Sequence, residues 1–248
     1  MITFKKLIKF ILNSIKLIVT DIRAKPYVAE TVEDFDLSYY KNKTIAIVGP
    51  ASTALLEKKG DYIDSFDIVV RINRSINNYL EKTEYLGSKT DILFHGLNES
   101  AIGGCGPVQP LQWIEKGVKK VVFPLFGNEH KGIINKYIIR SKGKLKLSCI
   151  NAATYNEMKN SLDGFRPTTG FASIYLMSKA EYKKLYITGF TFYKTPYQSD
   201  YKAVNIETER KNIQQENYHS FEIEYNCFKN IFNNSTNIII DEGMKEIM

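Results

Sequence analysis

Short apolar runs alternate with longer mixed segments along most of this chain. The apolar runs are rich in Val and Ile and occupy residues 44–48, 68–71, 91–94, 120–123, 185–188 and 237–240. The mixed segments predict helices at residues 54–59, 109–116, 152–161, 171–183 and 219–232. Apolar strands that alternate with helices predict a mostly parallel sheet with helices on both faces. We therefore expect an α/β fold, with one Rossmann-like domain over residues 41–248.

The first 24 residues have a different pattern, an apolar stripe beside a row of lysines. The stripe recurs at helical spacing and consists of Phe4, Leu7, Ile8, Ile11, Ile15 and Ile18. No apolar run approaches the roughly 18–20 residues that cross a bilayer, and polar residues at 13, 14 and 16 interrupt a signal-peptide centre. We expect a basic amphipathic helix over residues 1–24, which either binds an anionic membrane surface through residues 1–22 or packs on the domain. Residues 25–40, with Pro26 and an acidic run, are expected to form a connector.

The amino-acid composition excludes several classes of protein but does not identify a ligand. The 248 residues are 44% hydrophobic and 25% charged, which excludes a disordered or collagen-like chain. Three cysteines and three histidines argue against a disulfide scaffold, a Cys-rich zinc site and a multi-histidine centre, so we expect no metal and no cofactor. This cysteine usage suits a reducing cytoplasm. The net charge of +7 indicates an anionic partner of unspecified kind.

Two polar positions follow the first two apolar runs of the domain. The turn after residues 44–48 contains Gly49, which permits close approach of a ligand, and Ser52, which offers a hydroxyl near a helix start. It lacks both the G-x-G-x-x-G pattern and the P-loop lysine, so a purely structural turn is equally consistent. Asn73 ends the next strand, at the edge of the sheet where α/β proteins bind ligands.

Arg71 lies inside that second strand, where burial would demand a partner for its charge. Asp64 and Asp67 are the nearest candidates along the sequence. We expect an internal salt bridge here, rather than a ligand-binding arginine.

A second group of candidates surrounds the helix predicted at residues 171–183. Thr168, Thr169 and Gly170 precede it, and Thr169 is the expected N-cap. Free N–H groups at such a helix start bind phosphate or carboxylate, although ordinary capping requires no ligand. Gly189 ends the following strand.

The last candidates lie between that strand and the final helix. Tyr193, Tyr197 and Tyr201 follow Gly189 and form either a hinged lid with phenol donors or a plain surface loop. His219 is expected to begin the helix at 219–232, and imidazole suits proton abstraction near neutral pH. Glu224, five residues later, could orient a neighbour or the helix start. A structural or exposed histidine is the alternative.

In this order, the segments resemble the three motifs of the sialyltransferases. Residues 47–52 with I-D-S-F-D-I-V-V-R-I-N at 63–73 are similar to the long motif, and P-T-T-G at 167–170 with G-F at 189–190 to the short motif. His219 and Glu224 match the very short motif H-x-x-x-x-E. The matches span residues 44–224, and the part from Thr169 to Tyr193 also resembles the smaller bacterial sialyltransferases.

The resemblance implies a sialyltransferase-type variant of the GT-A fold, a CMP-activated donor and inversion at the anomeric carbon. It implies His219 as general base, with Glu224 as the second catalytic candidate. The donor-binding residues that it implies, together with the glycines beside them, are Gly49, Ser52, Asn73, Thr168, Thr169, Gly170, Gly189, Tyr193, Tyr197 and Tyr201. The cysteine pair of the animal members has no counterpart at residues 42–45 and 181–185, which suits a reducing compartment.

We therefore expect a metal-independent transferase of sialic acid or a related nonulosonic sugar, acting on a glycan or glycolipid acceptor at the inner face of the cell membrane. One alternative is a metal-dependent nucleotide-diphosphate sugar transferase, for which Asp34 and Asp36 would supply a D-x-D motif. Another is a non-catalytic module that binds membranes or nucleic acid through its basic charge. We expect no nucleic-acid partner, because no aromatic-basic stripe joins the lysine clusters.

Overall fold

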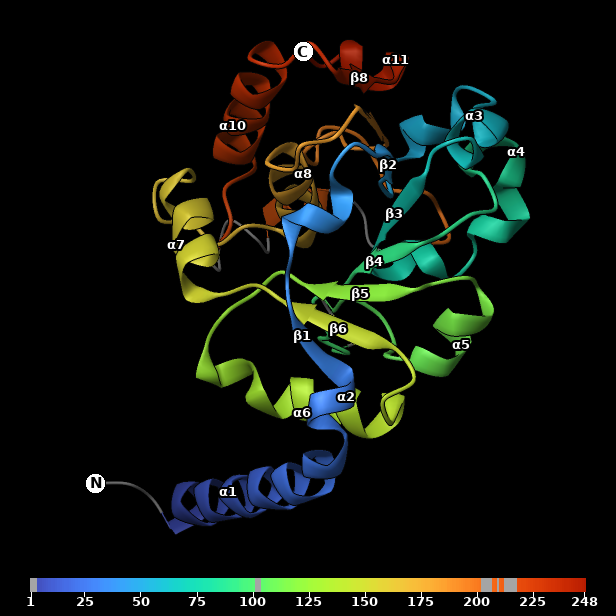
Figure 1. The fold of residues 1–248 in the computed structure, drawn as a ribbon. Coiled ribbons are helices and arrows are strands. Elements are labelled where there is room, and N and C mark those ends of the chain that lie inside the picture. The colour runs from blue at the N-terminus through green and yellow to red at the C-terminus, as the bar shows by residue number, and fades with distance from the viewer. Residues whose placement is uncertain (1–3, 101–103, 202–206, 209, 212–217) are drawn as a thin grey trace.

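A computed structural model describes residues 4–100, 104–201, 207–208, 210–211 and 218–248. Its centre is one sheet of eight parallel strands in the order β1-β6-β5-β4-β3-β2-β7-β8 (Figure 1). The strands are β1 Val32–Asp34, β2 Thr44–Val48, β3 Ile68–Ile72, β4 Ile92–Phe94, β5 Lys120–Phe123, β6 Lys146–Cys149, β7 Lys184–Thr188 and β8 Ile238–Ile240. The expected α/β class with a parallel sheet is confirmed.

Helices cover both faces of this sheet, because successive strand residues point alternately to opposite sides. One core contains Ile45 and Ile47 of β2 with side chains from α7, α8 and α10, and the other contains Ala46 and Val48 with side chains from α3, α4, α5 and α6. The helices are α1 Phe4–Ala24, α2 Val28–Thr31, α3 Gly60–Asp64, α4 Thr83–Leu86, α5 Pro110–Glu115, α6 Lys131–Ser141, α7 Ala152–Asn160, α8 Thr169–Ser178, α10 Phe221–Asn233 and α11 Glu242–Lys245. All the side chains from Phe171 to Met177 are buried, as expected of a helix enclosed on every side.

The strand order reverses beside β2, where ligands of α/β proteins bind. From β2 the chain moves outward through β3, β4, β5 and β6, and then returns to place β7 on the other side of β2. Gly49 and Gly189 directly follow β2 and β7, and their backbones are in contact, since a Cβ on Gly49 would lie 2.4 Å from the carbonyl oxygen of Gly189. Gly189 also has a φ of +72°, in the left-handed region that favours glycine.

Two sequence expectations about the elements were wrong. Residues 54–59 form no α-helix, because a 3-10 turn, Ser52–Leu55, ends there and Leu56 is exposed. The expected connector at 25–40 contains β1, which pairs with β6, so the sheet begins before residue 41. The strands β1 and β6 were not predicted, because half or more of the residues in each are polar. Strands at or near the edge of a sheet tolerate such polar residues.

The helix α1 lies beside α6, at the β1 end of the molecule (Figure 1). Its contact is partly polar: the carboxylate of Asp21 pairs with Lys131 at 2.6 Å and accepts a hydrogen bond from Asn135. Six apolar side chains of α1 remain 41–66% exposed and form what we call its apolar outer face: Ile8, Leu12, Ile15, Ile18, Val19 and Ile22. No helix in the described part of the chain is both long enough and apolar enough to cross a bilayer.

Candidate active site

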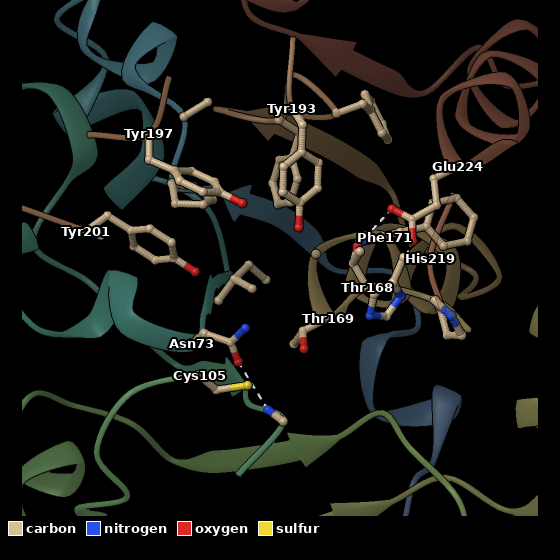
Figure 2. A pocket seen from close by; sticks show the side chains of 18 of the residues that line it. Asn73, Cys105, Thr168, Thr169, Phe171, Tyr193, Tyr197, Tyr201, His219 and Glu224 are labelled. Atoms are coloured by element: carbon tan, nitrogen blue, oxygen red, sulfur yellow. Dashed lines mark hydrogen bonds between the residues drawn. The ribbon is translucent and has the colours of Figure 1, made fainter. Parts of the chain in front are cut away.

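A cavity of about 800 Å³ opens at the carboxyl ends of the central strands (Figure 2). Its walls come from the segments after β2, β3, β4 and β7, from the start of α8 and from the segment before α10. Ten of the twelve residues expected from the sequence line it: Asn73, Thr168, Thr169, Gly170, Gly189, Tyr193, Tyr197, Tyr201, His219 and Glu224. Segments more than 140 residues apart in the sequence therefore meet in one site.

The two other expected residues, Gly49 and Ser52, are absent from the described lining of this cavity. The backbone of Gly49 is packed against Gly189, and the N–H of Ser52 donates to the carbonyl oxygen of Pro196 at 3.0 Å. Both hold the turn after β2 against the segment after β7. Their contacts are structural, which agrees with the alternative interpretation of this segment as a purely structural turn.

Asn73 directly follows β3 and has a left-handed conformation, with a φ of 47°. Its Oδ1 accepts a hydrogen bond from the N–H of Gly96 at 3.1 Å, and its amide nitrogen is turned toward the cavity (Figure 2). Left-handed backbone is uncommon outside glycine and clusters at functional sites. Asn73 thus offers a fixed amide donor at the floor of the cavity.

The salt bridge expected for Arg71 is not formed: no carboxylate of a described residue lies within ion-pair distance of it. Its guanidinium is fully buried and donates to Thr90 Oγ1 and to the backbone carbonyl oxygens of residues 86, 87 and 89. Asp64 instead accepts the backbone N–H groups of Ser88 and Lys89. Backbone carbonyl oxygens, and not the expected carboxylate, accept most of the hydrogen bonds of Arg71, so Arg71 is a structural residue.

The start of α8 is held by Glu224 through Thr168. Thr168, not the expected Thr169, is the N-cap, because its Oγ1 accepts the N–H of Phe171 at 3.1 Å. The N–H and hydroxyl of Thr168 in turn donate to the two carboxyl oxygens of Glu224 at 2.6 and 2.9 Å. Glu224 is only 2% exposed, and its burial, against these two hydrogen bonds, raises its pKa to about 8. The carboxyl is therefore mostly protonated at neutral pH, where its O–H can donate to Thr168 Oγ1 while its other oxygen accepts the N–H of Thr168, and it positions α8.

His219 precedes α10 instead of beginning it, since Ser220 caps the helix. Its Nδ1 lies 2.6 Å from the carbonyl oxygen of Arg166, and the N–H of Arg166 donates to the carbonyl oxygen of Tyr218 at 2.8 Å. A neutral imidazole that donates from Nδ1 has its basic lone pair on Nε2. The backbone next to α8 thus sets the tautomer and orientation of His219.

Tyr193, Tyr197 and Tyr201 form one side of the cavity, which we call the tyrosine wall. Their rings are in sequential contact, with centroid distances of 5.8 and 5.0 Å, and their hydroxyls point into the cavity (Figure 2). Burial raises the pKa of Tyr201, so that its phenol stays a neutral donor.

The tyrosine wall is anchored at several points, unlike the plain surface loop considered from the sequence. The N–H of Gln198 donates to the carbonyl oxygen of Pro50 at 2.9 Å, and Tyr197 pairs with Ala51 in an isolated antiparallel bridge. Lys82 forms an ion pair with Asp200 next to Tyr201. These contacts fasten the wall to the turn after β2 and to the helical turn Tyr79–Lys82.

Sequence reasoning did not assign some residues of the cavity. Cys105 lies beside Asn73, and Arg166 and Tyr218 adjoin His219. Cys105 belongs to the segment after β4, whose position at a strand end was a usable signal. Arg166 and Tyr218 belong to irregular segments that no periodicity marks.

The carboxylates of the D-x-D alternative lie away from this cavity. Asp34 ends β1 at the outer edge of the sheet, and Asp36 accepts the N–H of Ser38 at 2.8 Å as a helix cap. Neither residue lines the cavity. Within the described ranges, no group of three or more His, Cys, Asp or Glu side chains is placed to hold a metal ion.

Comparison with known proteins gives matches at the level of structure. Neither a protein-family model nor a curated protein sequence matches the chain. The fold is similar to the crystal structure of a mammalian sialyltransferase, with a TM-score of 0.57 and 18% identity over 91% of this chain and 79% of that chain. A mammalian sialyltransferase in complex with Gal-beta-1-3GalNAc-ortho-nitrophenol matches over the same shares, with a TM-score of 0.56 and 18% identity. Together with the parallel eight-stranded sheet, these similarities establish that the chain has a sialyltransferase-like fold.

Proposed function

We propose that the chain is an inverting, metal-independent glycosyltransferase, which moves sialic acid or a related nonulosonic sugar from a CMP-activated donor to a hydroxyl of a glycan. One observation carries the proposal: a single cavity joins the amide of Asn73, the tyrosine wall, the start of α8 and the imidazole of His219. The sialyltransferase-like fold supports the same activity.

The donor is anionic, and the cavity offers it neutral hydrogen-bond donors. We assign the nucleotide to the end with Asn73 and the leaving phosphate to the phenols of the tyrosine wall. The carboxylate of the donor sugar lies at the start of α8, where Thr169 and Gly170 present backbone N–H groups and the helix dipole favours negative charge. Preorganised donors of this kind stabilise the charge that develops on phosphate in the transition state. These hydrogen-bond donors can stabilise the charge of a single phosphate without a metal ion. We therefore propose that the reaction needs no metal.

His219 is the general base of the proposed reaction. The acceptor hydroxyl attacks the anomeric carbon from the face opposite the phosphate, and its proton passes to Nε2 of His219. The bond between the anomeric carbon and the phosphate oxygen breaks, and CMP leaves with the bonding electron pair. The carbonyl oxygen of Arg166 accepts from Nδ1 and stabilises the imidazolium that forms.

The substitution His219→Asn tests this role with little structural change. The asparagine amide can still donate to the carbonyl oxygen of Arg166, but it has no basic nitrogen. We expect transfer from CMP-sialic acid to fall by about 10²–10⁴-fold, while CMP still raises the melting temperature of the variant. A variant that transfers at a near wild-type rate would contradict the assignment. Turnover that needs manganese and stops in chelator would favour the metal-dependent alternative.

We also propose that α1 holds the enzyme on an anionic membrane surface, at the cytoplasmic face where lipid-linked acceptors are built. The apolar outer face of α1 is exposed, and Lys6, Lys16, Arg23 and Lys25 are exposed on or next to the same helix. A helix with this arrangement lies in the membrane interface, where each basic residue near anionic lipid contributes about 1 kcal/mol.

Vesicle sedimentation tests the membrane proposal. The double substitution Ile15→Ser and Ile22→Ser should release the protein from phosphatidylglycerol-containing vesicles, and transfer to a soluble acceptor should persist. The control Leu111→Ser changes a similarly exposed apolar residue on α5 and should leave binding unchanged. Equal sedimentation of the double variant and the control would refute the anchor.

A further inference from the structure

The cavity contains one cation that the proposed binding of the donor leaves unused. Arg166 lines the cavity half-buried, and its guanidinium carbon lies 5.6 Å from the centre of the Tyr218 ring. Among the residues that the structure describes, no carboxylate forms an ion pair with it. Arg166 is also the sole lysine or arginine in the described lining.

The described residues of the cavity do not neutralise the charge of Arg166. The described lining contains no aspartate, and its one glutamate is Glu224. Both carboxyl oxygens of Glu224 are bound by Thr168, and its raised pKa keeps it mostly protonated at neutral pH. An arginine that is partly removed from water without a counter-ion favours an anionic ligand.

The backbone of Arg166 lies on the acceptor side of the cavity, and its guanidinium lies over the neighbouring Tyr218 ring. Its carbonyl oxygen holds Nδ1 of His219, and its N–H is bonded to Tyr218, so the residue adjoins the proposed base. Asn73 and Tyr201, at the proposed nucleotide end, lie on the other side of the cavity from His219 (Figure 2). An acceptor hydroxyl within about 3 Å of Nε2 therefore has its sugar ring on the side of the cavity that Arg166 and Tyr218 line.

Tyr218 completes the site as an exposed aromatic face. The side chain is 53% exposed and carries the guanidinium of Arg166 over its ring. Cation–π contact holds the guanidinium in place, and the planar fork of arginine matches carboxylate and phosphate oxygens in pairs.

We propose that Arg166, supported by Tyr218, is a specificity-determining residue that selects an acceptor sugar with a carboxylate or phosphate near the attacking hydroxyl. This inference rests on the proposed transferase function and names the acceptor class of the same site. A neutral acceptor leaves the guanidinium without a partner, whereas an anionic acceptor forms paired hydrogen bonds with it.

Three acceptors of similar size test the proposal in transfer assays: lactose as the neutral acceptor, sialyllactose with a carboxylate and lactose 6′-phosphate with a phosphate. We expect wild-type kcat/KM to be about tenfold or more higher for at least one anionic acceptor than for lactose. Arg166→Gln should remove that preference, because the KM of the preferred anionic acceptor should rise about tenfold more than the KM of lactose. Arg166→Lys should retain part of the preference.

Lys144→Gln is the control, because it removes an exposed cation outside the cavity. Equal effects of this control and Arg166→Gln would overturn the proposal, as would a wild-type enzyme that prefers lactose. If Arg166→Gln weakens CMP binding and all acceptors alike, the arginine serves the donor and the proposal is wrong.

Calorimetric titration of sialyllactose, lactose and lactose 6′-phosphate without donor separates this inference from the proposed function. Binding of an anionic sugar that requires Arg166, together with no transfer from CMP-sialic acid, would support the anion site and contradict the transferase. Transfer from CMP-sialic acid, together with equal acceptor binding by wild type and Arg166→Gln, would support the transferase and contradict the anion site.

Discussion

Replacement of Glu224 by glutamine should remove a pH dependence of stability that the buried carboxyl creates. The pKa of Glu224 is about 8 in the folded protein, against an ordinary value of 4.5. Between these values the folded state keeps a proton that the unfolded state releases. The free energy of unfolding therefore falls as pH rises through this window, by up to about 1.4 kcal/mol per pH unit.

Glutamine reproduces the protonated carboxyl and does not titrate. Its Oε1 can accept the N–H of Thr168 and its amide can donate to Thr168 Oγ1, in place of the two bonds that Glu224 makes. We expect the free energy of unfolding of the variant, relative to that of wild type, to increase by about 2–3 kcal/mol as the pH rises from 5 to 7. Any contribution from the buried His95, whose pKa is lowered by burial to about 3, is common to both proteins and cancels in the difference.

Urea unfolding at pH 5, 6 and 7, followed by the fluorescence of the single, buried Trp113, measures this difference. Glu222→Gln is the control, because Glu222 is an exposed glutamate of the same helix. If the difference between wild type and Glu224→Gln stays constant with pH, Glu224 is ionised in the folded state and the reasoning is refuted.

Two further predictions concern the walls of the cavity. Lys82→Met removes the ion pair with Asp200 and should weaken CMP binding about 3- to 10-fold, because the tyrosine wall loses an anchor. The control Lys41→Met breaks an exposed ion pair and should leave CMP binding unchanged. Equal CMP affinities of the two variants in calorimetry would contradict this prediction. Gly189→Ala should cost more than about 2 kcal/mol in urea unfolding, because its Cβ would lie 2.7 Å from a backbone oxygen. Gly164→Ala, with a similar φ and open space, should cost only about 1–2 kcal/mol; similar losses would refute the close-packing argument.

The strands near the centre of the sheet could be predicted from sequence, and those toward one edge could not. A run such as 44–48 is apolar throughout because helices cover both of its faces, and this pattern is visible in sequence. Two of the four residues of β6 are Lys and Ser, since a strand near the edge needs less apolar surface. The helix α6 was missed because it has no side-chain N-cap and contains Gly132 near its start.

The candidate site was predicted largely through motif order, and its contacts were not. Most of the expected residues line one cavity, as parallel strands that end at the same edge require. The partners of Arg71 and His219 are backbone carbonyl oxygens, which every residue possesses and no sequence pattern marks. Arg166 was missed for the same reason, because its importance comes from its neighbours in space.

The most direct test of the central claim is a calorimetric titration of CMP, UDP and GDP, with chelator present, into wild type and Asn73→Ala. We predict that CMP binds at least about tenfold tighter than the two diphosphates and that Asn73→Ala loses most of this affinity. Tighter binding of UDP or GDP, or unchanged CMP affinity in the variant, would contradict a cytidylate site in this cavity.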